Sequence, residues 1–137
     1  MSDAYPAGNG AAGRRLAQGR KSDVLQARLT ELDPGMARWA DEFVFGEVWA
    51  RDGLSFEERS LVAVGVLAAT DRMDMLRNYL HGALQRGVPE EKLREALVMQ
   101  VVYAGFPLAI KALAELDGVL RAHRRHRDAE GSGEQPA

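Results

Sequence analysis

Few side chains in this sequence could exchange protons or act as nucleophiles near neutral pH. Its 137 residues include three histidines and no cysteine, which excludes thiolate nucleophiles, disulfide bonds, iron–sulfur clusters and thiolate zinc sites. Two of the histidines, His123 and His126, lie among arginines whose charge would oppose a divalent cation. We therefore expect no metal site. The sequence has neither a glycine-rich phosphate loop nor a Ser-His-Asp pattern, and we expect no cofactor.

Tyr79 and His81 lie close together in a segment whose apolar spacing is helical. At about 100° per residue, Tyr79 lies roughly 60° from Leu76 on the apolar side of the helix, and His81 lies roughly 140° from it. Tyr79 is therefore the inward-facing candidate, and we expect His81 at the solvent or at an interface. A tyrosine with an ordinary pKa near 10 can donate a hydrogen bond or a proton, but it is a poor base. The alternative is a core tyrosine whose hydroxyl reaches a carbonyl or water.

Arginines and aromatic residues supply the candidate substrate-binding groups. Arg59 and Arg72 could each hold a carboxylate through paired hydrogen bonds, although a solvated charge is the simpler interpretation of either. Ser60 could bond a substrate or its own helix backbone. Aromatic residues that could line a substrate pocket are Trp49, Tyr103 and Phe106.

Helical periodicity runs through residues 22–124 and predicts an all-α domain of about six helices. Asp33 followed by Pro34 is typical of a helix start. Ser55 and Glu58 form a capping-box pattern, which makes Glu58 a structural residue. Gly105 and Pro107 predict a break before the last helix. The predicted helices cover approximately residues 25–32, 34–49, 55–69, 72–86 and 89–103, with a final helix after the break.

The two ends of the chain lack this periodicity. Small residues, glycine and proline dominate residues 1–21, which we expect to form a flexible leader, and residues 125–137 are expected to form a flexible tail. The N-terminus carries no apolar signal segment, and the longest apolar stretch is half of what a membrane span needs. We therefore expect a cytoplasmic protein with no membrane partner.

Composition and charge narrow the class of partner. Apolar residues make up 46% of the chain, and the net charge is only −2, so a strongly basic nucleic-acid surface is not expected. Two stretches, residues 61–69 and 96–110, are apolar on nearly every helical side. A domain this small cannot easily bury both of them, and a surface helix of a monomer should show a polar face. We therefore expect self-association.

Several ordered motifs resemble the carboxymuconolactone decarboxylase family. They are Phe45-Gly46-Glu47-Val48-Trp49, Leu54-Ser55, Arg59-Ser60-Leu61-Val62, Ala83-Leu84, Gly87-Val88 and Tyr103-Ala104-Gly105-Phe106-Pro107. The resemblance implies the helical fold of alkyl-hydroperoxidase D-like proteins, assembled into trimers or hexamers. The family's peroxidase members carry a Cys-x-x-Cys pair, which is missing here, so thiol peroxidase activity is excluded because the thiolate is the nucleophile.

The same resemblance places Tyr79 where the decarboxylase members have a histidine, with His81 two residues later. It implies a cofactor-independent enzyme acting on a small-molecule substrate, a cyclic organic acid or lactone, by enolate stabilisation and protonation. The implied catalytic residues are Tyr79, His81 and Ser60. Two alternatives stay open. One is a tailoring enzyme of natural-product (polyketide) metabolism that catalyses a cyclisation or isomerisation, and the other is a non-catalytic oligomeric scaffold of the same fold.

Overall fold

A computed structural model describes residues 4–132, and within this range the regular structure is entirely helical, which confirms the all-α prediction. The elements in chain order are α1 (Gly10–Gln18), the 3₁₀ turn η1 (Gly19–Lys21), α2 (Ser22–Leu32), α3 (Pro34–Trp39), the π-helix η2 (Ala40–Val48), α4 (Phe56–Ala69), α5 (Met73–Gln85), α6 (Glu90–Val98), α7 (Gln100–Tyr103) and α8 (Phe106–Ser132).

Local signals in the sequence set several helix ends. The Asp33 carboxylate accepts hydrogen bonds from two backbone N–H groups at the start of α3, with Pro34 as its first residue. Ser55 and Glu58 form the predicted capping box, with each side chain accepting from the other residue's backbone N–H group. Gly105, with φ of 101°, occupies the left-handed region between α7 and α8, where a side chain would be strained.

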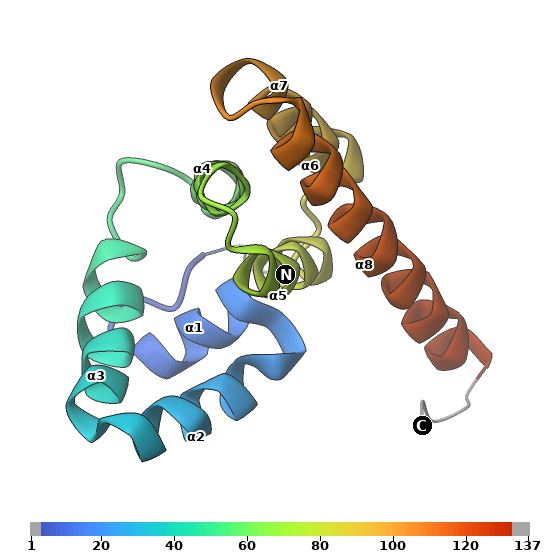
Figure 1. The fold of residues 1–137 in the computed structure, drawn as a ribbon. Coiled ribbons are helices and arrows are strands. Elements are labelled where there is room, and N and C mark those ends of the chain that lie inside the picture. The colour runs from blue at the N-terminus through green and yellow to red at the C-terminus, as the bar shows by residue number, and fades with distance from the viewer. Residues whose placement is uncertain (1–3, 133–137) are drawn as a thin grey trace.

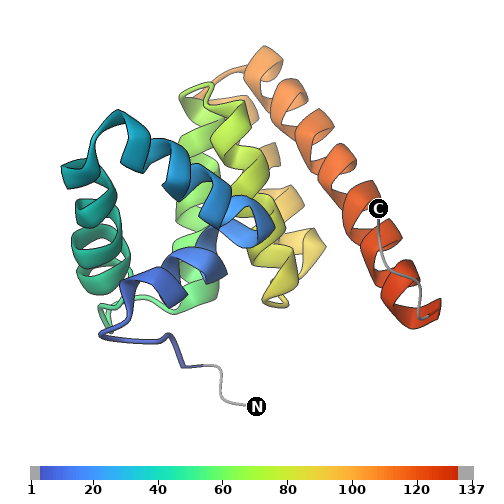
Figure 2. The same ribbon diagram turned by 90° about the horizontal axis from the view of Figure 1, so that it is seen from below.

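The helices form three layers around α5 (Figures 1 and 2). Helices α1 to η2 lie on one side, α4 and α5 run through the middle, and α8 crosses the other side. The core lies between α4, α5, α6 and α8, and several of its side chains are completely buried. These are Val64, Ala68, Leu76, Leu80, Ala83, Leu93, Leu97, Ala112 and Leu116. One face of α5 therefore belongs to the core, and its other faces meet the outer layers.

The prediction of a flexible leader over residues 1–21 is wrong for residues 10–21, which form α1 and η1. Ala17 and Arg14 are 1% and 4% exposed. The glycines that suggested flexibility instead permit close contacts. A Cβ atom on Gly10 would lie 1.6 Å from the Asp41 carbonyl oxygen, and one on Gly82 of α5 would lie 2.2 Å from the Ala17 carbonyl oxygen. The sequence shows that a glycine has no side chain, but it does not show that the backbone of another helix occupies the space.

The predicted tail beginning at residue 125 is also wrong as far as residue 132, because α8 continues to Ser132. Residues 133–137 lie outside the described part of the chain. Side-chain contacts between successive turns support the helix in this region: an ion pair of Asp117 with Arg121, and a contact of 3.1 Å between His126 Nε2 and Glu130. The basic run at residues 121–127 therefore lies within α8 rather than at its end. Although α8 is long, no helix of the described residues is apolar enough to cross a membrane.

The predicted helix over residues 34–49 changes character along its length. From Ala40 onward the chain is a π-helix, closed by a hydrogen bond of 2.9 Å from the Trp49 N–H group to the Val44 carbonyl. Such segments are often found at functional sites because the wider turn redirects side chains. Here it buries Phe45 and ends at Val48, with Trp49 directly after it.

We predict that Gly82→Ala will lower the free energy of unfolding by at least about 2 kcal/mol, because the new methyl group would overlap the end of α1. Gly118→Ala is the matched control. It lies in α8 with no atom within 4 Å of the added Cβ, and it should stabilise the helix by up to about 1 kcal/mol. Urea unfolding followed by circular dichroism measures both. Equal effects of the two substitutions would contradict the α1–α5 contact.

Candidate active site

Five aromatic side chains meet beside α5. The ring centroid of Trp49 lies 5.9 Å from Phe45, 5.9 Å from Phe56 and 6.0 Å from Tyr79. Tyr5 stacks on Phe56 at 6.5 Å. These distances are typical of favourable aromatic pairs. We call these five residues the aromatic cluster. It joins the N-terminal segment, η2, α4 and α5.

Next to the aromatic cluster lies a hollow of about 170 Å³, which we call the site hollow. Its lining is apolar except for one guanidinium, and the lining residues are Val48, Trp49, Leu54, Arg59, Val62 and Ala63. A space of this size suits a small metabolite rather than a drug-sized ligand. A single cation in this apolar lining could attract an anion.

Arg59 carries the unsatisfied donor of the site hollow. Its Nη2 donates to the Arg51 carbonyl oxygen at 2.7 Å, but its Nε is buried and has no hydrogen-bond partner among the described residues. No carboxylate of residues 4–132 forms an ion pair with it. A buried donor without an acceptor is costly, and a bound carboxylate would supply the missing acceptor.

Tyr79 packs against the core on one side and Trp49 on the other. Burial raises the pKa of its hydroxyl above the ordinary value, while a hydrogen bond of 3.5 Å donated by the Gln18 side chain acts in the opposite direction. The phenol is therefore protonated at neutral pH. The described hydrogen bonds include no acceptor for its own proton.

Tyr5 is a second phenol of the aromatic cluster. Burial is the main cause of its raised pKa, which the nearby Tyr79 raises further and the charge of Arg59 lowers. Its hydroxyl donates to the Phe45 carbonyl oxygen at 2.7 Å. The Tyr5 proton is thus already engaged, in contrast to the proton of Tyr79.

His81 faces away from the aromatic cluster, since two residues turn a helix by about 200°. It is half-buried rather than solvated, and its Nδ1 is buried without a hydrogen-bond partner among the described residues. Desolvation is the largest cause of its low pKa of about 4, and positive charges on η1, α5 and α8 lower it further. These charges belong to Arg20, His123, Lys21 and Arg77. Of the two expected surroundings of His81, solvent or an interface, full solvation is wrong, because α8 and η1 pack against this part of α5.

The other sequence candidates lie elsewhere. Ser60 is buried, in the row of α4 that continues through Val64 and Ala68 into the core, and it does not line the site hollow. Arg72 is exposed at the start of α5. Of the sequence candidates, Trp49 and Arg59 therefore line the site hollow, and Tyr79 contacts Trp49 without lining it.

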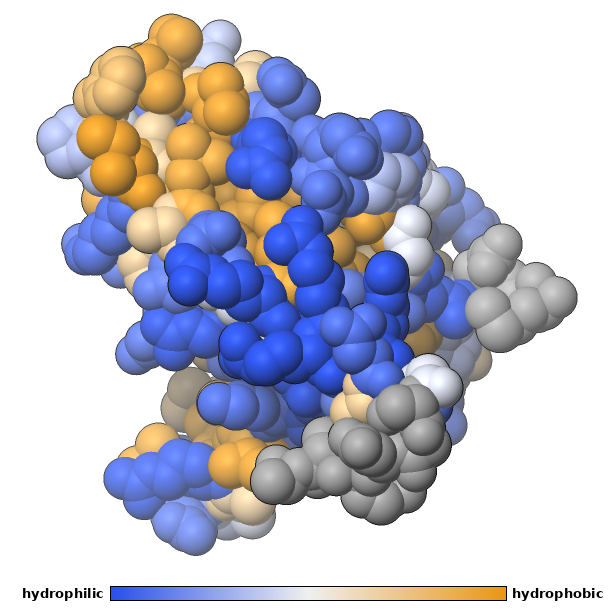
Figure 3. Space-filling model, turned by 90° about the vertical axis from the view of Figure 1, so that its right-hand side faces the viewer, coloured by the Kyte–Doolittle hydropathy of each residue, from blue (hydrophilic) through white to orange (hydrophobic). Residues whose placement is uncertain are grey.

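Tyr103 and Phe106 lie near a second, larger hollow of about 690 Å³ between α4, α6 and α7, which we call the apolar groove. Tyr103 lines it and is 74% exposed, while Phe106 nearby is 63% exposed. Figure 3 shows apolar residues gathered at this end of the molecule. Three charged residues of α6, Glu91, Lys92 and Glu95, also line the apolar groove, and Lys92 pairs with Glu57 at 2.9 Å. The Gln100 amide, the one uncharged polar side chain of the apolar groove besides the Tyr103 phenol, donates to the Ala96 carbonyl.

Two site residues, Tyr5 and Gln18, were missed because they lie in the segment expected to be flexible. No local pattern marks them, since each reaches its partner across a long sequence separation: Tyr5 to Phe45 and Gln18 to Tyr79. Within residues 4–132 no group of three or more His, Asp or Glu side chains could hold a metal ion.

Comparison with known proteins shows the family to which this sequence belongs. The sequence matches the carboxymuconolactone decarboxylase family over residues 34–118. This chain belongs to that family. It is 33% identical over 93 residues to a 4-carboxymuconolactone decarboxylase of Acinetobacter baylyi, which covers 68% of this chain and 69% of the relative. It is 36% identical over 72 residues to a nitrosuccinic acid decarboxylase of Metarhizium robertsii, which covers 53% of this chain and 50% of the relative.

The region that matches the carboxymuconolactone decarboxylase family, residues 34–118, contains Trp49, Arg59 and Tyr79. It begins after the N-terminal helices α1 and α2. Tyr5 and Gln18 precede residue 34 and lie outside the matched region. Both relatives are named as decarboxylases, which supports a decarboxylase-like function at the level of the family.

His81 provides a test of the packing around α5. Its folded-state pKa of about 4 lies below the unfolded value of about 6.5. The unfolded state therefore binds the proton more readily, so stability is complete above pH 6.5 and is lost as the pH falls towards 4. Since the imidazole is half-exposed and screened, we expect a loss of about 1–2 kcal/mol.

We predict that His81→Gln will remove this part of the pH dependence, whereas His126→Gln in α8 will retain it. Urea unfolding between pH 7 and pH 4 measures the difference. Parallel stability curves for the wild type and His81→Gln would show that His81 is not buried beneath α8 and η1.

Proposed function

We propose that this protein is a cofactor-independent decarboxylase that acts on a small organic acid in the site hollow. Arg59 binds a carboxylate of the substrate, Trp49 forms an apolar wall, and Tyr79 donates a hydrogen bond and then a proton. The observation that carries this proposal is the buried Nε atom of Arg59, which has no partner among the described residues, beside an apolar hollow lined by Trp49. The protonated phenol of Tyr79 packs against that tryptophan.

The reaction needs no redox partner. The bond between the carboxylate carbon and its neighbour breaks, carbon dioxide leaves, and the electron pair stays on the neighbouring carbon. An adjacent oxygen-bearing group delocalises that pair as an enolate-like anion, and one proton added at carbon completes the product. Hydrogen-bond donors held in a low-dielectric site stabilise such an anion, and a positioned general acid contributes about 10²–10⁴-fold to the rate.

The printed names of the two relatives define the substrate class to test. Both 4-carboxymuconolactone and nitrosuccinic acid combine carboxyl groups with an electron-withdrawing group, a lactone in one and a nitro group in the other. One carboxylate can leave as carbon dioxide while another remains to pair with a guanidinium. This common chemistry supports a substrate with at least two acidic groups for this chain.

Tyr79 changes the acid–base chemistry relative to a histidine at that position. An imidazole can both accept and donate a proton near pH 7, whereas a phenol with a raised pKa acts only as a donor. We infer that the reaction requires a donor and no strong base at this position. Decarboxylation fits this requirement, because a carboxylate substrate is already deprotonated at neutral pH.

We predict that Tyr79→Phe will lower kcat about 100-fold or more while the thermal midpoint of unfolding stays near the wild-type value, since only the hydroxyl is removed. Carbon dioxide release from 4-carboxymuconolactone and from nitrosuccinic acid measures turnover. Wild-type kcat in the Tyr79→Phe protein would reject the role of the phenol, and a wild-type protein inactive on both acids would reject this substrate class.

We predict that Arg59→Gln will raise KM about 10- to 100-fold, which corresponds to the loss of a charge-assisted hydrogen bond. Arg94→Gln, an exposed change on α6, is the control and should leave KM within twofold. The same steady-state assay measures both proteins. A KM unchanged by Arg59→Gln would place the substrate carboxylate elsewhere.

We also propose that the chain forms a trimer or hexamer through the apolar face near the apolar groove. Apolar side chains there are more than half exposed, which is unusual for the surface of a monomer. They are Val62, Val66, Val102, Phe106 and Ile110. Val62 lines both the apolar groove and the site hollow, so a neighbouring subunit would lie beside the site.

We predict that Val102→Asp will dissociate the oligomer, because it places a charge in the apolar face. Val24→Asp is the matched control, since Val24 on α2 is 69% exposed and Val102 is 78% exposed. Sedimentation velocity gives the subunit number of each. A monomeric wild-type protein, or an intact oligomer with Val102→Asp, would contradict the proposed interface.

A further inference from the structure

We propose that Gln18 is a positioning residue that keeps the phenol proton of Tyr79 free for a bound substrate. Gln18 does so as the last member of a series of hydrogen-bonded side chains, Arg14, Ser22 and Gln18, which we call the polar chain. The inference rests on the proposed function, in which Tyr79 is the donor. It concerns residues of α1 and α2, which lie outside the part of the chain that matches the family.

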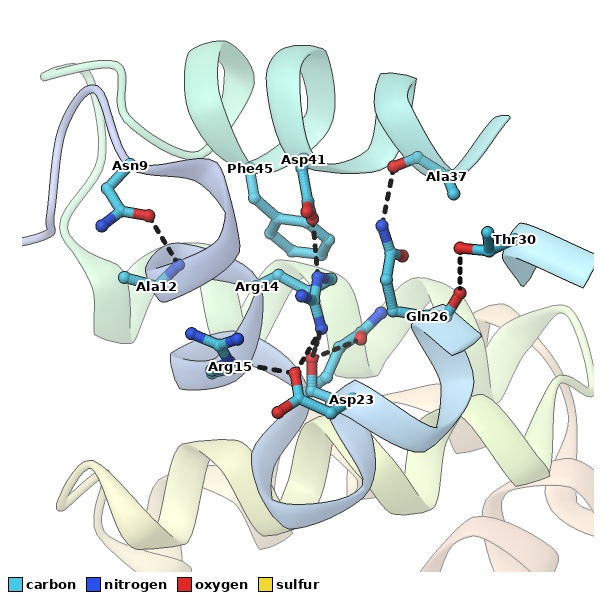
Figure 4. A network of polar contacts seen from close by, with 12 residues as sticks. Asn9, Ala12, Arg14, Arg15, Asp23, Gln26, Thr30, Ala37, Asp41 and Phe45 are labelled. Carbon is cyan, nitrogen blue, oxygen red and sulfur yellow. Dashed lines mark hydrogen bonds and ion pairs between the residues drawn. The ribbon is translucent and has the colours of Figure 1, made fainter. Parts of the chain in front are cut away.

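The chain of contacts begins with a guanidinium held between three helices (Figure 4). Arg14 of α1 is 4% exposed, and its Nε lies 2.6 Å from an Asp41 carboxylate oxygen on η2. Its Nη1 donates to the Ser22 hydroxyl at 2.6 Å and lies 3.2 Å from Asp23. The two carboxylates compensate the buried charge and hold the guanidinium in place.

The direction of each hydrogen bond in the polar chain follows from the Arg14 guanidinium, which is its first donor. A guanidinium has only donors, so the Ser22 oxygen must accept from Arg14. The Ser22 hydroxyl then uses its own proton to donate to Oε1 of Gln18 at 3.1 Å. With its oxygen engaged by Ser22, the Gln18 amide presents its N–H group to the Tyr79 hydroxyl, at 3.5 Å.

Tyr79 is consequently the acceptor in its contact with Gln18. A phenol that accepts one hydrogen bond keeps its own proton for another partner. The neighbouring Tyr5 shows the alternative, since its proton is donated to the Phe45 carbonyl. Of the two phenols in the aromatic cluster, Tyr79 is therefore the one whose proton remains available for a hydrogen bond to a substrate.

The backbone around Gln18 is held rigidly enough for this purpose. Gln18 is followed by Gly19, which has a φ of 76° and ends α1 in a conformation that favours glycine. The last turn of α1 lies directly against Gly82, three residues after Tyr79 on α5. Ser22 is 1% exposed. Gln18 therefore reaches Tyr79 from a fixed position, which a side chain on a mobile leader could not do.

The first experiment does not depend on turnover. Carbon-13 labelling of tyrosine Cζ, with Tyr79→Phe to assign the signal, follows ionisation of the Tyr79 phenol by NMR titration in wild type and in Gln18→Leu. If Gln18 donates to the phenol oxygen, losing that donor raises the pKa of Tyr79. An unchanged or lowered pKa would overturn the proposal, because a phenol that donated to Gln18 would become more acidic on losing its acceptor.

The second experiment tests the consequence for catalysis. The carboxylate of Gln18→Glu has no donor and would draw the Tyr79 proton towards itself, so we expect kcat to fall at least about tenfold, part of the 10²–10⁴-fold effect of a general acid, with KM changed less than about threefold. Gln26→Glu is the matched control. It makes the same change on α2, where the Gln26 amide donates to the Ala37 carbonyl, and it should keep wild-type kcat.

The outcomes separate this inference from the proposed function. Wild-type kcat in Gln18→Glu, measured in a protein that decarboxylates, would overturn the positioning role. A wild-type protein that decarboxylates neither acid would reject the proposed function, while the NMR titration would still decide whether Gln18 donates to Tyr79.

Discussion

The close approach of α1 to α5 at Gly82 determines much of this structure. Because Gly82 has no side chain, carbonyl groups at the end of α1 lie against the α5 backbone, and any Cβ atom would overlap them. The contact places Gln18 beside Tyr79 and carries Arg14 to its partners on η2 and α2. The N-terminal layer is therefore part of the site.

The buried guanidinium of Arg14 explains how this layer holds its geometry. Removing such a charge from water costs several kcal/mol unless partners surround it. The partners of Arg14 come from two different helices: Asp41 from η2, and Ser22 and Asp23 from α2. The same contacts that compensate the charge therefore fix the position of η2, whose end carries Trp49 into the aromatic cluster.

The site combines an unpaired cation, an apolar wall and a neutral donor. Each has a distinct physical origin. The Nε atom of Arg59 lacks an acceptor among the described residues, Trp49 of the aromatic cluster forms an apolar wall, and burial keeps Tyr79 protonated. An arrangement of this kind suits a reaction in which negative charge moves from a carboxylate to a neighbouring oxygen.

Sequence spacing alone was sufficient for the all-α class, for the capping box at Ser55 and for the side of α5 on which Tyr79 lies. These properties depend on residues within a few positions of one another, so helical periodicity reveals them. The helical state of residues 10–21, the burial of His81 beneath α8 and the contact of Gln18 with Tyr79 depend on backbones far apart in the chain. Only the folded structure could decide these, because a glycine that permits close packing and a glycine in a flexible segment look the same in a sequence.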